Sequence, residues 1–87
     1  MELESSIQLK IKKELQKRGY FVTKLIQTST PGIPDLLAIK DGKSFFIEVK
    51  RPKVGVLSEI QKYRIEELQS FGAIAIVAYS INDLSFL

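Results

Sequence analysis

The dipeptide Asp41-Gly42, which lies between two apolar runs, constrains the fold of this chain most strongly. Asp-Gly in this context predicts a β-hairpin with a two-residue type I′ turn, because both turn positions require positive φ. With this turn, Asp35 on the first strand faces Glu48 on the second. Side chains alternate along a strand, so Lys50 shares the face of Glu48. The hairpin therefore predicts two adjacent carboxylates with a lysine two residues further on.

Opposed carboxylates repel one another unless a proton or a cation lies between them. Two clustered carboxylates with open positions suit a hard divalent ion such as Mg²⁺, which prefers oxygen ligands and retained water. Lys50 would then stabilise charge on an attacking water or on a phosphate. The alternative interpretation is that Glu48 and Lys50 form a solvent-exposed ion pair and that Pro34-Asp35 is turn chemistry. The hairpin register favours the metal site.

The rest of the chain predicts two helices and four strands in the order α-β-β-β-α-β. Helices are predicted over residues 3–18 and 58–71, and strands over residues 20–27, 36–39, 44–50 and 73–79. The last strand is almost wholly apolar and follows a helical crossover, so it should pair in parallel with a neighbour. The predicted fold class is α/β, with a mixed central sheet flanked by helices.

Each predicted helix carries one polar residue, Glu4 or Gln61, that could have either a structural or a functional role. Glu4 lies in the apolar stripe of Ile7 and Ile11. Its carboxylate either is placed favourably near the positive end of the helix dipole or reaches the hairpin as a third acidic ligand. On the second helix, Ser58 is the expected N-cap and Gln61 has the spacing of a capping-box partner. The buried face of this helix is expected to comprise Ile60, Tyr63, Leu68 and Phe71.

Composition limits the chemistry further. The 87 residues, 45% hydrophobic and 26% charged, fit one folded domain, and no apolar run approaches the ~20 residues needed to span a bilayer. The absence of cysteine and histidine removes disulfides, thiolate zinc sites and the commonest general base. Any hydrolytic reaction would therefore use carboxylates, lysine and a hard metal ion. The simplest location for a chain of this composition is inside a cell. The net charge of +3 permits a polyanionic partner. Candidate contacts to nucleic acid are Lys10, Lys13, Lys24, Arg51, Lys53 and Lys62.

Several motifs in order resemble those of known nucleases. Pro34-Asp35 followed by Glu48-Val49-Lys50 resembles the PD-(D/E)xK signature of restriction-endonuclease-like enzymes, whose core has the same element order. The chain is most similar to the virus-type replication-repair nuclease (VRR-NUC) family. The features shared with that family are Glu4 with Gln8, Gly32 to Asp35, Glu48 to Pro52, Leu57-Ser58 with Gln61, and Phe71 to Ala73.

The resemblance implies that residues 1–87 form a single metal-dependent DNA endonuclease domain. Asp35 and Glu48, with the Val49 carbonyl, would bind Mg²⁺ or Mn²⁺, and Glu4 would add a ligand or a water contact. Lys50 would orient the attacking water. Gln61 would lie near the site, although its capping role explains the residue equally well.

Stand-alone members of this family resemble Holliday-junction resolvases, which cut four-way DNA junctions as two-fold dimers. The alternatives are a flap-selective, single-strand-selective or restriction-type nuclease, or a non-catalytic DNA-binding module on the same fold. A cytoplasmic or nucleoid-associated location and a virus or phage source are compatible with all of these. The C-terminal apolar residues Ile81, Leu84, Phe86 and Leu87 either form a patch for self-association or close the core of the monomer.

Overall fold

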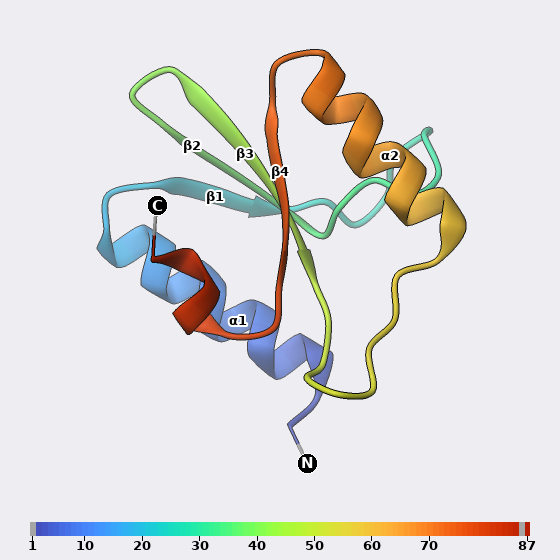
Figure 1. Ribbon diagram of the computed structural model, residues 1–87. Helices are drawn as coiled ribbons and strands as arrows, with labels where there is room; N and C mark the ends of the chain where they lie inside the picture. Colours follow the sequence, from blue (N-terminus) through green and yellow to red (C-terminus); the bar gives the residue numbers. More distant parts are fainter. Residues whose placement is uncertain (1, 86) are drawn as a thin grey trace.

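The chain folds into a four-stranded sheet with one long helix on each side (Figure 1). The computed structural model describes residues 2–85 and residue 87. In chain order the elements are α1 (Glu4–Lys17), β1 (Phe21–Lys24), β2 (Leu36–Lys40), β3 (Lys43–Val49), α2 (Glu59–Ser70), β4 (Ile74–Ala78) and the short 3₁₀ helix η1 (Ile81–Leu84). The predicted α/β class and the order of the long elements are confirmed. No helix in the described part of the chain is long and apolar enough to cross a membrane.

The hairpin of β2 and β3 has the predicted register. Leu36 lies opposite Ile47. Asp41 and Gly42 have φ angles of 53° and 77°, as a type I′ turn requires. The sheet order is β1-β2-β3-β4, with the first three strands antiparallel and β4 parallel to β3, as predicted for a strand that follows a crossover. The first strand is shorter than predicted, because its pairing with β2 ends at Lys24.

The main core lies between α1 and one face of the sheet. Ile11, Leu15, Ile47 and Val49 are completely buried there, so the helical stripe of α1 packs on the inward-facing residues of β3. The remaining members of this core are Ile7, Tyr20, Val22, Leu36, Ala38, Phe45, Ala78 and Leu84. Glu48 has the opposite orientation along β3 and therefore faces the side of the sheet on which α2 lies.

The predicted buried face of α2 is wrong at Ile60, Tyr63 and Phe71, and only Leu68 of the predicted set is half-buried. Ile60, Tyr63 and Phe71 are 44%, 56% and 84% exposed, and Ile65 is the buried residue of this helix. The helix is rotated so that Gln61 faces the sheet, where its amide donates a hydrogen bond to Glu48. With Ile65 inward, helical spacing also turns residues 61, 68 and 69 toward the sheet and turns residues 60 and 63 away from it. The orientation that hydrophobicity alone predicted incorrectly is thus one in which a polar side chain contacts the sheet.

The C-terminal residues mainly close the core of the monomer. Leu84 is completely buried and Leu87 packs against the same core, while Ile81 is partly exposed. Phe86 lies outside the described residues. The predicted C-terminal patch for self-association is therefore not formed by Leu84, which α1 and the sheet cover.

Candidate metal centre

The candidate site lies at the open end of the hairpin, away from the turn. Asp35 directly precedes β2, and its Oδ2 accepts a hydrogen bond of 2.8 Å from the backbone N–H of Val49. This side-chain contact continues the strand pairing beyond Leu36 and Ile47, so Asp35 comes to lie beside Glu48. The carboxylate of Asp35 is consequently held by the backbone of the strand that carries its partner.

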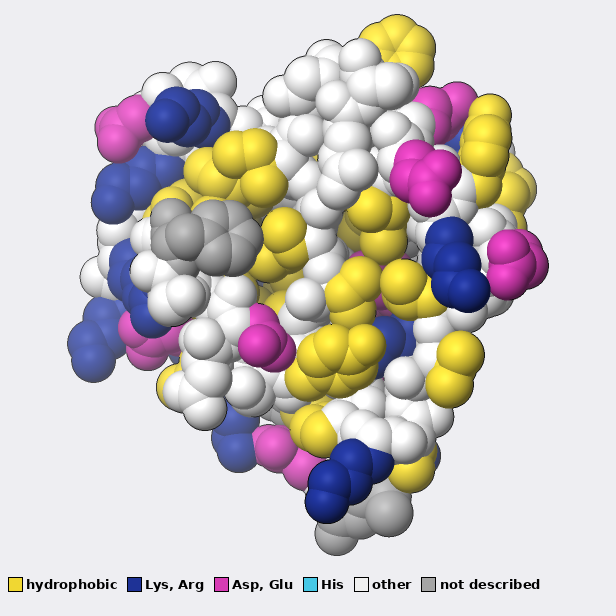
Figure 2. Space-filling view, in the orientation of Figure 1, with side chains coloured by type: hydrophobic (Ala, Val, Ile, Leu, Met, Phe, Trp, Pro, Cys, Tyr) yellow, Lys and Arg dark blue, Asp and Glu magenta, His cyan; other side chains and the backbone are white. Residues whose placement is uncertain are grey.

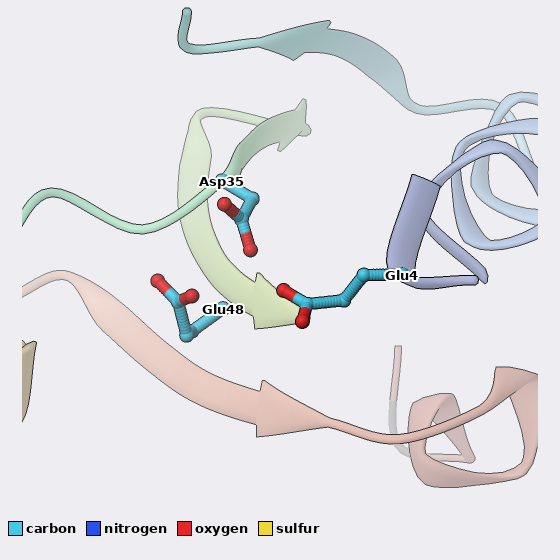
Figure 3. A group of neighbouring side chains, drawn as sticks. All are labelled: Glu4, Asp35 and Glu48. Atoms are coloured by element: carbon cyan, nitrogen blue, oxygen red, sulfur yellow. The ribbon is translucent and has the colours of Figure 1, made fainter. Parts of the chain in front are cut away.

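Three carboxylates, from α1, from the residue before β2 and from β3, converge at this end (Figure 3). Glu4 extends from the first turn of α1, and one oxygen each from Glu4, Asp35 and Glu48 lies within 4.8 Å of the others. Opposite ligands on an octahedral Mg²⁺ are about 4.2 Å apart, since Mg–O distances are 2.0–2.1 Å. A small rotation of these side chains therefore suffices to place all three around one ion. The oxygen-only donor set is the one that Mg²⁺ and Mn²⁺ prefer.

Glu48 is the most perturbed member of the cluster. It is 1% exposed. Burial, then the negative charge of Asp35 and a hydrogen bond with it, and to a smaller extent the charge of Glu4, raise the pKa of Glu48 to about 8. The nearby ammonium of Lys50 opposes this effect. Near neutral pH the Glu48 carboxyl group therefore keeps its proton unless a cation takes the place of that proton.

Two further side chains contact Glu48 Oε2. Lys50 Nζ lies 3.7 Å away, and Gln61 Nε2 donates a hydrogen bond of 3.3 Å. Gln61 also forms the predicted capping box: its Oε1 accepts from the Ser58 N–H at 3.0 Å, and its own N–H donates to Ser58 Oγ at 3.2 Å. The two roles considered for Gln61 are thus compatible, because one amide starts α2 and contacts the acidic cluster.

The loop before Asp35 packs tightly against the start of α2. Gly32 has a φ of 80°, and a Cβ atom at this position would lie 2.8 Å from the carbonyl oxygen of Ile60. Arg64 Nε donates a hydrogen bond of 2.9 Å to the Pro31 carbonyl, which fastens the same loop to the helix. The segment that leads into Asp35 and the helix that carries Gln61 therefore hold each other in place.

Replacing Gly32 with Ala is expected to destabilise the protein more than replacing Gly42 with Ala. Both glycines have φ near 80°, so each substitution costs about 1–2 kcal/mol of backbone strain. Only at Gly32 does the new methyl group meet backbone, which adds about 1–3 kcal/mol, whereas nothing lies within 4 Å at Gly42. Urea denaturation of both variants measures the difference. Equal losses would contradict the close packing of this loop on α2.

The predicted nucleic-acid contacts occupy different surroundings. Lys10 forms an ion pair with Glu2, and Lys62 forms one with Glu59 at 3.4 Å. Lys13 and Lys53 are exposed, and Arg51 is half-buried. Lys24 lines a cleft beside the acidic cluster together with Lys12.

Lys12 is absent from the nucleic-acid contacts that the sequence predicts. The available signal was its spacing, since Lys12 follows Glu4 by eight residues and Gln8 by four, which places all three along one face of α1.

The mixed sheet, the two helices and the acidic cluster define an α/β domain of the restriction-endonuclease-like kind. The model of the VRR-NUC domain family matches residues 1–82, and the chain belongs to this family. A solved structure described as "VRR_NUC domain" has 28% sequence identity and a TM-score of 0.83, with 97% of this chain and 91% of that chain covered. A second, described as "VRR_NUC domain protein", has 24% identity and a TM-score of 0.77, with 97% and 84% covered. No curated protein matches the chain. The chain therefore has the nuclease fold of the VRR-NUC family.

Proposed function

We propose that this domain is a divalent-metal-dependent DNA endonuclease that hydrolyses phosphodiester bonds. The observation that carries the proposal is the buried carboxyl of Glu48, which lies against Asp35 and Glu4 with Lys50 alongside. Such crowding of acidic groups destabilises a protein without a cation and is suited to binding one. A domain that only bound DNA would gain nothing from acidic groups, since they repel the phosphates.

The residues of the cluster have two roles: some bind the metal ion, and Lys50 orients the attacking water. Glu4, Asp35, Glu48 and the Val49 carbonyl would hold Mg²⁺ or Mn²⁺, which when bound polarises the scissile phosphate and lowers the pKa of a water molecule. Asp35 is fixed for this task by its hydrogen bond from Val49. Lys50 has three N–H donors beside the cluster, with which it orients the attacking water and stabilises negative charge on the phosphate.

Gln61 acts as a positioning residue. Its amide contacts Glu48 Oε2 and is itself held by Ser58 at the start of α2. The hydrogen bond from Gln61 on α2 therefore holds one oxygen of Glu48 in place, so less side-chain entropy is lost when Glu48 binds an ion. In this proposal, Gln61 influences the reaction through Glu48 and does not contact the substrate.

We propose a four-way DNA junction as the preferred substrate and a two-fold homodimer as the active form. A domain of 87 residues offers little surface for a branched substrate, and two sites related by a dyad suit paired incisions. Apolar side chains are available for self-association: Phe46, Leu68, Phe71 and Ile74 line a hollow of about 600 Å³ between the hairpin and α2. Figure 2 shows hydrophobic side chains exposed between α1 and α2, with basic side chains mostly nearer the margin of that face.

A panel of DNA substrates tests the function directly. A four-way junction, a flap, a single strand and a plain duplex of related sequence are incubated with the protein in Mg²⁺, in Mn²⁺ or in EDTA. We expect cleavage that requires the ion and paired, symmetric incisions in the junction at a rate at least tenfold above the duplex. Light scattering should give twice the chain mass of 9.9 kDa.

The outcomes of this panel separate the competing functions. Equal cutting of every substrate would contradict a junction resolvase while retaining a nuclease, and preference for the flap or the single strand would reassign the substrate. DNA binding without cleavage in either ion would indicate the non-catalytic module.

A further inference from the structure

A cleft of about 280 Å³ adjoins the acidic cluster on the side of α1. Its lining residues are Ser5, Gln8, Leu9, Lys12, Lys24 and Leu36, and we call it the lysine-lined cleft. Ser5 directly follows Glu4 and Leu36 directly follows Asp35, so two of the walls are continuous with the residues of the candidate metal site. The cleft therefore begins one residue along the chain from Glu4 and from Asp35.

The polar wall of the cleft is a row on one face of α1. Gln8 and Lys12 follow Glu4 at successive intervals of four residues, and each interval advances about 6 Å along the helix. This row runs alongside the buried stripe of α1, which fixes its position against the sheet. Lys12 consequently lies about 12 Å along the helix from Glu4, a distance of a few nucleotides of one DNA strand.

The second lysine comes from the neighbouring strand. Lys24 pairs with Leu36 in the β1–β2 ladder, and the next residue, Leu25, donates its N–H to the Asp35 carbonyl at 2.8 Å. In the described part of the chain, neither Lys12 nor Lys24 has an acidic partner. Two unneutralised ammonium groups thus share one concave site beside three carboxylates, which is an arrangement for a bound anion.

The remaining walls suit the nucleoside attached to such an anion. Leu9 and Leu36 provide apolar surface, and Leu9 is half-exposed. The Gln8 amide oxygen is enclosed without a hydrogen-bond partner among the described residues, so it is available to accept a hydrogen bond from a bound group. The volume is just below the ~300 Å³ at which pockets for drug-sized ligands begin, which fits one nucleotide.

We propose that the lysine-lined cleft is a subsite for one nucleotide of the DNA strand being cut, with Lys12 and Lys24 binding its backbone phosphate. The proposal rests on the nuclease function proposed above and specifies how its substrate strand runs: from the carboxylates along α1. Lys12 and Lys24 act as positioning residues for the scissile phosphate, and Gln8 contacts the nucleoside.

The test compares two double variants that remove equal charge. K12A/K24A removes the two lysines of the cleft, and K17A/K43A removes two lysines from the far end of α1 and from the hairpin turn. Binding of a fluorescent DNA of the wild type's preferred structure is measured by anisotropy in EDTA at several salt concentrations. We expect K12A/K24A to weaken binding at least tenfold and to reduce the salt slope by about one to two, with less than a threefold change in K17A/K43A.

A second measurement locates the contacted phosphate. Single linkages within four nucleotides of the cut are replaced by uncharged methylphosphonate. At one linkage the replacement should slow wild-type cleavage at least fivefold and leave the residual rate of K12A/K24A unchanged, because the two changes remove the same contact. Equal binding by the two double variants would overturn the subsite, as would additive effects at every linkage.

The two proposals fail in different ways. Wild-type protein that binds DNA through Lys12 and Lys24 but never cleaves it would refute the nuclease and support the subsite. Protein that cleaves DNA with both double variants equally active would refute the subsite and support the nuclease. Wild-type protein that binds no DNA would refute both. Circular dichroism melting of each variant confirms that the comparison is made between folded proteins.

Discussion

Replacing Glu48 with Gln is expected to stabilise the metal-free protein at pH 8 by a few kcal/mol and to reduce metal-dependent cleavage more than 100-fold. The neutral amide has the shape of the protonated acid, so it can donate to Asp35 and accept from Gln61 as Glu48 does when protonated. It cannot take a negative charge, which removes both the repulsion among the carboxylates and a metal ligand. Loss of a ligand should exceed the 10–100-fold effect of losing an outer partner of a metal site.

The pH dependence of this stabilisation has a definite sign. The pKa of Glu48 is raised from 4.5 to about 8 in the folded protein, chiefly by burial and by Asp35. A folded-state pKa above the unfolded value means that protonated Glu48 contributes stability that is complete below pH 4.5 and is lost as the pH rises to 8. Each pKa unit corresponds to about 1.4 kcal/mol. Wild type should therefore lose stability over this range by an amount that the Glu48→Gln variant does not share.

Urea denaturation in EDTA at several pH values between 4.5 and 9 measures the difference between wild type and the Glu48→Gln variant. The two free energies of unfolding should be similar at the acidic end and diverge toward pH 8. Glu66→Gln is a matched control, because Glu66 is exposed on α2. Adding Mg²⁺ at pH 8 should stabilise wild type and leave Glu48→Gln unaffected. A constant difference across the pH range would show that Glu48 ionises normally in the folded protein.

Replacing Asp35 with Asn should lower metal-dependent cleavage by about 100- to 1,000-fold while the fold is retained. The Asn side chain keeps an oxygen that can accept the hydrogen bond from Val49, so the strand contact survives. The substitution removes the negative charge that an ion requires. Single-turnover cleavage of the preferred DNA, together with calorimetric titration of Mn²⁺, measures both losses.

Asp41→Asn is the matched control for this prediction. The same chemical change then falls in the hairpin turn, where φ is 53° and where Asn is well tolerated. This variant should cleave DNA at the wild-type rate. Full activity of Asp35→Asn would refute the assigned metal site.

The parts of the fold that were predicted correctly depend on local chemistry. Asp41-Gly42 dictates the turn, the turn dictates the register, and the register places Asp35 beside Glu48. The capping box at Ser58 and Gln61 is equally local, because both partners lie within one turn.

The parts that could not be predicted depend on packing between distant elements. The rotation of α2 brings Gln61 to Glu48, a contact between distant elements that no hydrophobic pattern within the helix encodes. The reach of Glu4 to the cluster depends on how α1 docks on the sheet, so its two interpretations could not be separated from the sequence. Lys12 and Lys24 meet only when α1 and β1 are in place.

The hairpin also determines the order in which the candidate site can assemble during folding. Asp35 and Glu48 are close along the chain, and an isolated hairpin forms in about 1–10 μs, so this pair can meet before the rest of the domain is ordered. Glu4 and Gln61 arrive only when the two helices dock, which requires contacts at longer sequence separation. An early pair of carboxylates can capture an ion weakly, whereas the complete ligand set exists only in the native state. Because Glu4 lies on α1 and Gln61 lies on α2, a high affinity for the metal ion would indicate that both helices have docked in their native positions.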